Sequence, residues 1–213
     1  MRPLSLSGLR SVLLLGAHSD DIEIGCGGTV LRLVAHNPDV AVHWIVFSGQ
    51  GDRTREAEAS AARFLSGTKS RTVEVHQFRD GFFPAEQARI KTYFEELKAR
   101  LDPDLVFTHH RDDLHQDHRV VCELTWNTFR RHAVLEYEVP KWDGDLGRPN
   151  VYVPLDEAHA KRKVEILMEC FGTQAGKHWF DEETFNALMR LRALECNAPS
   201  RRAEAFYGRK VTL

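Results

Sequence analysis

Residues 12–29 decide the fold, and they read VLLLGAHSDDIEIGCGGT. The apolar run from Val12 to Leu15 gives way at Gly16 to a polar segment, and a helix-like segment follows. A short apolar run bounded in this way is typical of a buried strand that opens a strand–helix unit. The run is too short to span a membrane and lacks a small-residue cleavage site, so we expect a cytoplasmic protein.

Outward from this stretch, apolar runs keep alternating with longer helical patterns. We expect strands at Val12–Leu15, Val40–Phe47, Thr72–Phe78 and Leu105–Thr108. Between and after them we expect helices at Thr54–Leu65, at Pro84–Leu101 and from Asp117 onward. Alternating strands and helices predict an α/β fold, here a Rossmann-like three-layer α/β/α arrangement with a mostly parallel sheet.

The C-terminal part is less regular. A strand-like segment at Ala133–Val139 and a loop with Gly and Pro at Lys141–Pro149 precede helices at Asp156–Phe171 and Asp181–Glu195 and a strand-like tail. The loop is too short to link two domains, so residues 1–213 are expected to form a single domain. The basic run Lys161-Arg162-Lys163 is expected to be a solvated helix face.

Composition excludes several classes of partner. The 213 residues carry 29 Lys and Arg against 31 Asp and Glu, a net charge of -2, so no global positive field attracts nucleic acid or anionic lipid. The four cysteines lie far apart without a Cys-x-x-Cys pair, which favours buried reduced thiols. The sequence leaves open whether the chain forms a homo-oligomer.

The polar residues after the first strand stand where a ligand site is expected. In open parallel sheets, ligands bind outside the carboxyl ends of the strands. His18 and Asp21 are three residues apart, so one turn can bring both side chains to a single ion. Asp20 need not be a ligand and can instead contact water on that ion and take its proton. Taken alone, Asp20 and Asp21 could equally cap the following helix.

A second polar cluster follows the fourth predicted strand. Residues 108–119 read THHRDDLHQDHR and also lie at a carboxyl end of the sheet. Two His and one Asp with an open position for water form a familiar type of catalytic zinc site. His18, Asp21 and one of the later histidines supply that set. The same ligands also serve other divalent ions such as iron or cobalt.

Both clusters resemble motifs of the zinc-dependent de-N-acetylases of the PIG-L/LmbE-like type. The family's first motif is Ala-His-Pro-Asp-Asp before a Gly-rich turn, and residues 17–21 read AHSDD ahead of three glycines. The second motif, His-x-Asp-His, is present as HQDH at residues 115–118. The resemblance covers Val12 to Arg119 well and is weak beyond. Ser19 replaces the family's usual Pro, which removes a fixed backbone φ but no ligand.

The resemblance implies a function and a set of roles. It implies a zinc-dependent hydrolase that uses metal-bound water to remove an N-acetyl group from an amino sugar, a small-molecule substrate. The implied metal ligands are His18, Asp21 and His118, and Asp20 is the implied general base. His115 would stabilise the oxyanion or protonate the leaving amine, and Asp117 would orient a histidine. Zinc lowers the pKa of bound water to about 7, which lets Asp20 remove its proton.

Several residues near the motifs have two readings. The glycines 25, 27 and 28 do not fit a dinucleotide fingerprint, because residue 30 is Val, and no P-loop is present. They serve either a tight turn that lets the backbone approach the site or helix packing. Cys26 could be a soft fourth ligand, although the resemblance gives it no such role. His109 and His110 line the pocket or pack at the strand end.

Candidates for contacting the substrate and for supporting the site are less specific. Arg55 and Asp80 are expected to bind sugar hydroxyls or an anionic group, but a helix-surface Arg and a turn Asp would look the same. Asp113 is a better candidate than Asp112 for orienting a ligand. Four aromatic residues either cover the pocket or pack in the core: Trp142, Tyr152, Trp179 and Phe180.

Three functions therefore compete. The leading one is N-deacetylation of a free, glycosidic, lipid-linked or nucleotide-linked N-acetylglucosamine-like sugar. The second keeps the metal but cleaves another amide or an ester, since the constellation requires only an acyl carbon. The third is a non-catalytic Rossmann-like protein that binds a metal or ligand. Retention of both Asp20 and His115, which simple ligation does not need, disfavours the third.

Overall fold

A computed structural model of the protein describes residues 8–210. Its centre is a seven-stranded sheet in the order β3-β2-β1-β4-β5-β7-β6. The strands are β1 (Ser11–His18), β2 (Ala41–Ser48), β3 (Ser70–Val75), β4 (Leu105–His109), β5 (Ala133–Tyr137), β6 (Val151–Pro154) and β7 (Ala203–Gly208). Strands β1 to β5 pair in parallel, whereas β7 pairs antiparallel with both β5 and β6.

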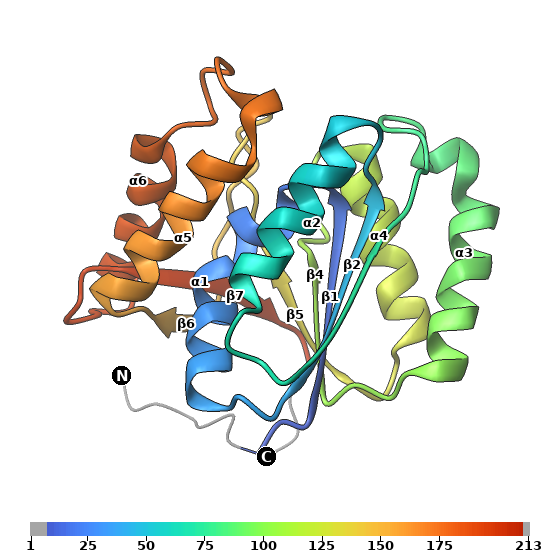
Figure 1. Ribbon diagram of the computed structural model, residues 1–213, viewed down its shortest axis with the longest axis horizontal. Coiled ribbons are helices and arrows are strands. Elements are labelled where there is room, and N and C mark those ends of the chain that lie inside the picture. The colour runs from blue at the N-terminus through green and yellow to red at the C-terminus, as the bar shows by residue number, and fades with distance from the viewer. Residues whose placement is uncertain (1–7, 211–213) are drawn as a thin grey trace.

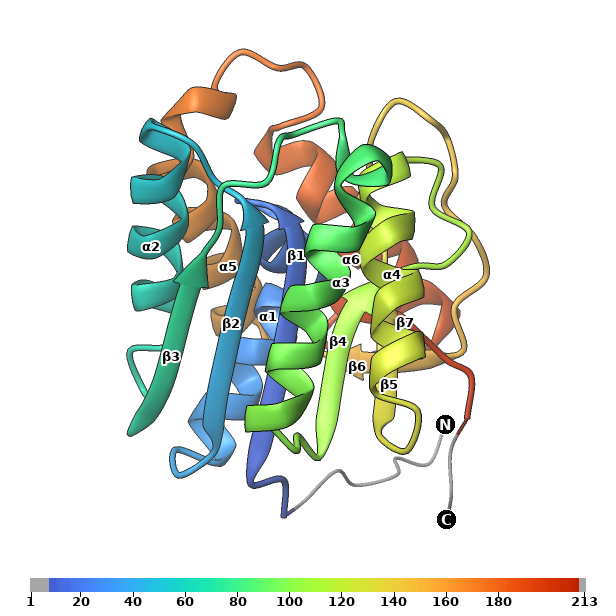
Figure 2. The ribbon, with the colours of Figure 1, turned by 90° about the vertical axis from the view of Figure 1, so that its right-hand side faces the viewer.

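Helices cover both faces of this sheet. They are α1 (Asp21–His36), α2 (Asp52–Phe64), α3 (Phe83–Arg100), α4 (Gln116–Thr128), α5 (Glu157–Cys170) and α6 (Glu182–Glu195), with a short 3-10 turn at Gly172–Gln174. Figure 1 shows α3 and α4 on one face and α1, α2 and α5 on the other, and Figure 2 looks at the sheet from the α3 and α4 side. No helix within residues 8–210 is long and apolar enough to cross a membrane.

The sheet confirms the expected α/β class with a mostly parallel arrangement. The expected strand at Thr72–Phe78 is shorter and lies at Ser70–Val75, and beyond it Gln77 forms only an isolated bridge with Ser48. The strand β6 was not predicted: its four residues end in Pro154, so they give little periodic signal. The strand-like tail is β7, which joins β5 and β6 in one sheet.

The glycines after the first motif lie inside α1 and not in a tight turn, so helix packing is the correct one of the two readings. A Cβ atom at Gly25 would lie 2.1 Å from the Tyr137 ring. At Gly28 it would lie 2.3 Å from Leu155 Cδ1. Both glycines therefore allow α1 to approach its neighbours more closely than any side chain permits.

The strand order places the two polar clusters side by side. The chain proceeds outward from β1 to β2 and β3, then crosses to β4 on the other side of β1. This reversal makes the carboxyl ends of β1 and β4 a topological switch point, which is where open α/β sheets bind ligands. His18 ends β1, and the loop after His109 leads from β4 into α4.

The C-terminal segments pack against the α1 side of the sheet. Phe180 is buried in the core, and Trp179 packs against it, as the core-packing reading expected. Trp142 is 72% exposed and stacks on His178, with ring centroids 3.9 Å apart. The expectation of a solvated face for the basic run at residues 161–163 is wrong for Lys163. Its side chain is buried because it forms an internal ion pair with Glu204.

Candidate active site

Three side-chain atoms from the two motifs converge on one point at the switch. His18 Nδ1 lies 3.2 Å from Asp21 Oδ2 and 3.2 Å from His118 Nε2. His118 Nε2 lies 3.4 Å from the same Asp21 oxygen. A tetrahedral ion with ligand bonds of about 2.0–2.1 Å separates its ligand atoms by about 3.3 Å. The spacing of the three atoms therefore fits a common zinc-sized ion.

The outer nitrogen of each histidine is held by a carboxylate. His118 Nδ1 donates to Asp113 Oδ2 at 2.9 Å, and His18 Nε2 lies 3.3 Å from Asp117 Oδ2. Such carboxylate–histidine pairs fix the ring orientation and the tautomer of metal-binding histidines. With their protons on the outer nitrogens, both rings present lone pairs inward, toward each other and toward Asp21.

The arrangement of these acceptor atoms also favours a bound cation. Three acceptor atoms face one another at 3.2 to 3.4 Å, and the backbone N–H of His18 donates to Asp21 Oδ2 at 2.6 Å. Neutral rings with inward lone pairs repel a carboxylate at this distance unless a positive charge lies between them. The donor set therefore fits a divalent cation by both geometry and charge.

Asp117 is itself fixed by the loop that precedes α3. Its Oδ2 accepts from Gly81 N at 2.6 Å and its Oδ1 accepts from Phe83 N at 3.1 Å. The side chain is fully buried. Asp117 thus links the His18 ring to the segment after β3, in the position expected of an orienting carboxylate.

Asp20 lies beside the convergent atoms but is bound differently. Its Oδ1 accepts from Arg53 NH2 at 2.8 Å, whereas its Oδ2 is buried with no hydrogen-bond partner among the described residues. Burial raises the pKa of Asp20, and the neighbouring Arg53 charge opposes this rise. One carboxylate oxygen is anchored, and the other is free to accept a proton.

His115 caps the start of α4 and stacks near both inward-facing rings. Its Nδ1 accepts from Asp117 N at 3.3 Å, so the proton of a neutral ring resides on Nε2. Its ring centroid lies 4.6 Å from that of His118 and 4.9 Å from that of His18. Burial lowers the pKa of His115, which favours a neutral imidazole that donates through Nε2.

The sequence of this central region identifies the family. A family model described as PIG-L: GlcNAc-PI de-N-acetylase matches residues 13–129, more than half of the 213 residues. The chain belongs to the PIG-L family. The match spans both motifs and ends at the close of α4.

Comparisons with individual proteins agree with this membership. The PIG-L chain is 28% identical over 168 residues to YaiS of Escherichia coli (strain K12), described as an uncharacterized deacetylase, covering 74% of the chain and 89% of YaiS. Its fold is shared by N,N'-diacetylchitobiose deacetylase from Pyrococcus horikoshii, with a TM-score of 0.64, 19% identity, and coverage of 93% and 83% of the two chains.

Another structural neighbour shows that this fold supports more than one chemistry. GalB from Pseudomonas putida KT2440, a 4-carboxy-2-hydroxymuconate hydratase, has a TM-score of 0.76 at 17% identity and covers 96% of this chain and 98% of its own. Likeness at this identity shows the fold alone. The reaction of this PIG-L protein must therefore be argued from its side chains.

The structure brings seven of the eight predicted site residues together at this edge of the sheet, and Asp80 is one of them. His18 Nε2 lies 3.1 Å from Asp80 Oδ1, and the Asp80 side chain is 63% exposed, so it faces both the site and solvent. Arg55 is not brought there. Its side chain is 75% exposed and pairs with Asp52, because a helix turns residues two apart to different faces.

Arg53 is the arginine that reaches the site, and sequence reasoning missed it. The sequence of α2 predicts a helix, but it does not predict which of Arg53 and Arg55 lies on the face toward the site. Asp113 was anticipated as an orienting residue, but its second partner was not: Lys141 Nζ lies 2.9 Å from Asp113 Oδ2. Lys141 comes from the loop after β5, where no sequence pattern links it to the motifs.

His109 and Cys26 both lie near the PIG-L motifs, and of the two only His109 belongs to a potential metal-binding group, with Asp21 and His118. His109 Nε2 lies 3.3 Å from Asp21 Oδ2 but accepts from Ala17 N at 2.9 Å, so its lone pair is already used. Burial, then the His118 charge, lowers the pKa of His109 to about 4, which keeps it neutral. Cys26 is buried, burial raises its pKa, and it joins none of the potential metal-binding groups in residues 8–210.

Proposed function

We propose that this protein is a zinc-dependent N-deacetylase that removes an acetyl group from the nitrogen of an N-acetylglucosamine-like amino sugar. The observation that carries the proposal is the triangle of His18 Nδ1, Asp21 Oδ2 and His118 Nε2, with the free oxygen of Asp20 beside it. Membership in the PIG-L family supports an acyl group as the group that is removed and an amino sugar as the substrate. A deacetylase that acts on diacetylchitobiose shares the fold, which is consistent with this assignment.

His18, Asp21 and His118 would hold the metal ion. When bound there, zinc would lower the pKa of a water molecule to about 7 and polarise the acyl carbonyl. Asp113 and Asp117 would keep the two imidazole rings in the orientation that binding requires. Iron or cobalt would suit the same donor atoms.

Asp20 would act as the general base. Its Oδ2, which lacks a partner, would accept a proton from the attacking water as the new C–O bond forms. Arg53 would keep Oδ1 in place and favour the ionised state at the start of the reaction. The same proton can then pass from Asp20 to the amine nitrogen as the C–N bond breaks, so that acetate and a free amino sugar leave.

His115 would stabilise the oxyanion. The bond from Asp117 N to Nδ1 leaves Nε2–H available, and the lowered pKa favours a neutral donor over a protonated acid. Of the two roles that the family resemblance implies for His115, donation to the oxyanion is therefore the better supported. Loss of one such donor typically costs about 3 kcal/mol of transition-state stabilisation.

Substrate contacts and cellular setting complete the proposal. Asp80 would accept from a sugar hydroxyl while touching His18, and the protein would act as a single domain in the cytoplasm. No observation favours an anionic nucleic acid as a partner, given the net charge of -2.

The deciding experiment compares acetate release from N-acetylglucosamine, from an aryl N-acetylglucosaminide and from N-acetyl amino acids, using zinc-loaded wild-type protein and the Asp20→Asn variant. We expect release from the sugars that depends on Asp20. Release from the amino acids alone would replace the proposal with a different amidase. Zinc binding without release from any acyl compound would favour a binding protein.

A further inference from the structure

A buried ion pair contacts the backbone of α1 close to its first turn. In an α-helix, the N–H of residue 28 and the carbonyl of residue 24 are the donor and the acceptor of one backbone hydrogen bond. Here Gly28 N donates to Glu204 Oε1 at 2.8 Å, and the Ile24 carbonyl accepts from Lys163 Nζ at 2.6 Å. Lys163 Nζ in turn lies 2.7 Å from Glu204 Oε1. The two side chains thus bridge the donor and the acceptor of that helical bond.

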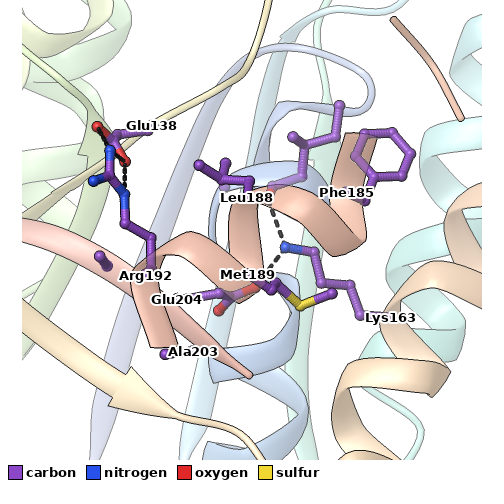
Figure 3. Close-up of a pocket in the computed structure, with 11 residues that line it drawn as sticks. Glu138, Lys163, Phe185, Leu188, Met189, Arg192, Ala203 and Glu204 are labelled. Carbon is purple, nitrogen blue, oxygen red and sulfur yellow. Dashed lines mark hydrogen bonds and ion pairs between the residues drawn. The ribbon is translucent and has the colours of Figure 1, made fainter. Parts of the chain in front are cut away.

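Glu204 holds a second N–H of the same helix. Thr29 N donates to Glu204 Oε2 at 2.6 Å, so both carboxylate oxygens are bound to the α1 backbone. Glu204 lies on β7 and Lys163 on α5, and both lie outside the region that matches the family model. Figure 3 shows the Lys163 side chain reaching from α5 toward Glu204 in the cavity that they line.

The ion pair is fully internal. The side chains of Lys163 and Glu204 are each 3% exposed. A buried ion pair pays a desolvation cost that often cancels its attraction, so a packed apolar pair would serve stability as well or better. The particular effect of this pair is directional, because it binds a backbone carbonyl and two backbone N–H groups of one helix at defined positions.

The first turn of α1 connects this pair to the active site. Ile24 N donates to Asp20 O at 3.0 Å, so the residue whose carbonyl Lys163 binds also holds the backbone of Asp20. Asp21 is the first residue of the same turn. Gly25 lies against the Tyr137 ring, and Tyr137 OH donates to Leu15 O at 2.6 Å in β1. The turn is therefore fixed between the sheet on one side and Lys163 on the other.

We propose that Lys163 and Glu204 are positioning residues of the active site. By binding the Ile24 carbonyl and the N–H groups of Gly28 and Thr29, their ion pair holds the start of α1 and places the Asp20 and Asp21 carboxylates at the metal-binding point. The inference rests on the proposed function for the roles of Asp20 and Asp21. The C-terminal segments, which contribute no metal ligand, thereby set the geometry of the ligand-bearing turn.

A second buried ion pair in the same cavity provides a matched control. Arg192 NH2 lies 2.8 Å from Glu138 Oε2, with both side chains under one-tenth exposed. Figure 3 shows this pair beside Lys163 and Glu204. Glu138 also accepts from Gly147 N and Tyr207 OH, but it makes no hydrogen bond to α1. Glu138→Gln therefore removes an equally buried charge without touching that helix.

The test measures the zinc dissociation constant by competition with a chromophoric chelator, together with the free energy of unfolding in urea. We expect Glu204→Gln and Lys163→Met to weaken zinc binding by about tenfold or more, the size of effect seen when groups that orient ligands are removed, and Glu138→Gln to change it by less than about twofold. Equal zinc affinity in all three variants and the wild type, whatever their stabilities, would overturn the proposal.

Two measurements on zinc-free protein keep this proposal separate from the proposed function. In the wild type, a coupling across the hydrogen bond should join Gly28 N to the Glu204 carboxyl carbon, and the absence of that coupling would refute the contact on which the proposal depends. Glu204→Gln should shift the amide resonances of residues 20–25, and Glu138→Gln should not. If the variants do not fold, the wild-type coupling still decides. A wild type that binds no zinc would refute the proposed function only.

Discussion

The two portions of the chain that meet at α1 differ in what they contribute. Residues 13–129 match the PIG-L family model and hold every residue of the convergent cluster, with the proposed ligand atoms 3.2 to 3.4 Å apart. The segments after β5 hold none of these, yet they place Lys141 on Asp113 and Glu204 on the α1 backbone. In the proposed function, one portion carries the reacting groups, and the other contacts the groups that would orient them.

The two portions also differ in how their contributing groups are arranged along the chain. The motifs are short because each carries several groups on one turn. The supporting contacts come from distant segments and consist of single side chains that bind backbone or carboxylate atoms. The effects of substitutions in the two portions should therefore differ both in the property that changes and in the size of the change.

The largest effect is expected from loss of a proposed ligand. His118→Ala should abolish stoichiometric zinc binding and all acetate release, because two remaining ligands hold zinc poorly in water. Metal content after dialysis, measured by elemental analysis beside the wild type, checks this. Full metal content in His118→Ala would remove His118 from the ligand set and point to His115 or His109.

Asp20→Asn should separate chemistry from metal binding. The amide cannot accept the proton from water, so kcat should fall by about 10²- to 10⁴-fold while zinc affinity stays near that of the wild type. Single-turnover acetate release and the chelator competition assay give the two quantities. Loss of zinc with retained rate at saturating metal would reverse the roles of Asp20 and Asp21.

Two arginines on α2 test whether an effect on kcat requires direct contact with Asp20 or only a position on the same helix. Arg53 donates to Asp20, whereas Arg55 pairs with Asp52 in solvent. Arg53→Met should lower kcat by about tenfold, because it removes a charge-assisted hydrogen bond to the proposed base. Arg55→Met should leave kcat and KM unchanged. Equal losses in both variants would show that α2 acts through the fold and not through the Arg53 contact.

The smallest effect is expected in the acid range, at the junction of β5 with the end of β7. Burial raises the pKa of Glu136, but bonds from His110, Arg209 and others outweigh it and lower that pKa from 4.5 to about 2. A lowered folded-state pKa contributes stability above pH 4.5 that is lost as the pH falls toward 2.

The free energy of unfolding of zinc-free wild type should therefore decrease with falling pH across this range, and Glu136→Gln should reduce that slope. Urea unfolding with a chelator present measures both proteins without a contribution from metal release. Parallel slopes in the two proteins would mean that Glu136 titrates alike in the folded and unfolded states.

Local patterns predicted the parallel part of the fold, and tertiary context determined the rest. The apolar runs of β1, β2 and β4 are buried on both faces, so their strand character shows in sequence. The positions of the two motifs at strand ends likewise predicted that the motifs would meet, whereas the choice of His118 among the later histidines came from the family resemblance. Lys163 was placed on a solvated face because a lysine in a basic run gives no sign of a partner 41 residues away on β7.

The most direct test of the central claim is anomalous diffraction at the zinc edge from crystals of the wild-type protein loaded with one equivalent of zinc. One peak is expected within about 2.0–2.3 Å of His18 Nδ1, Asp21 Oδ2 and His118 Nε2. A peak on the opposite side of the His18 ring, between Asp80 and Asp117, or no peak in this region, would contradict the claim.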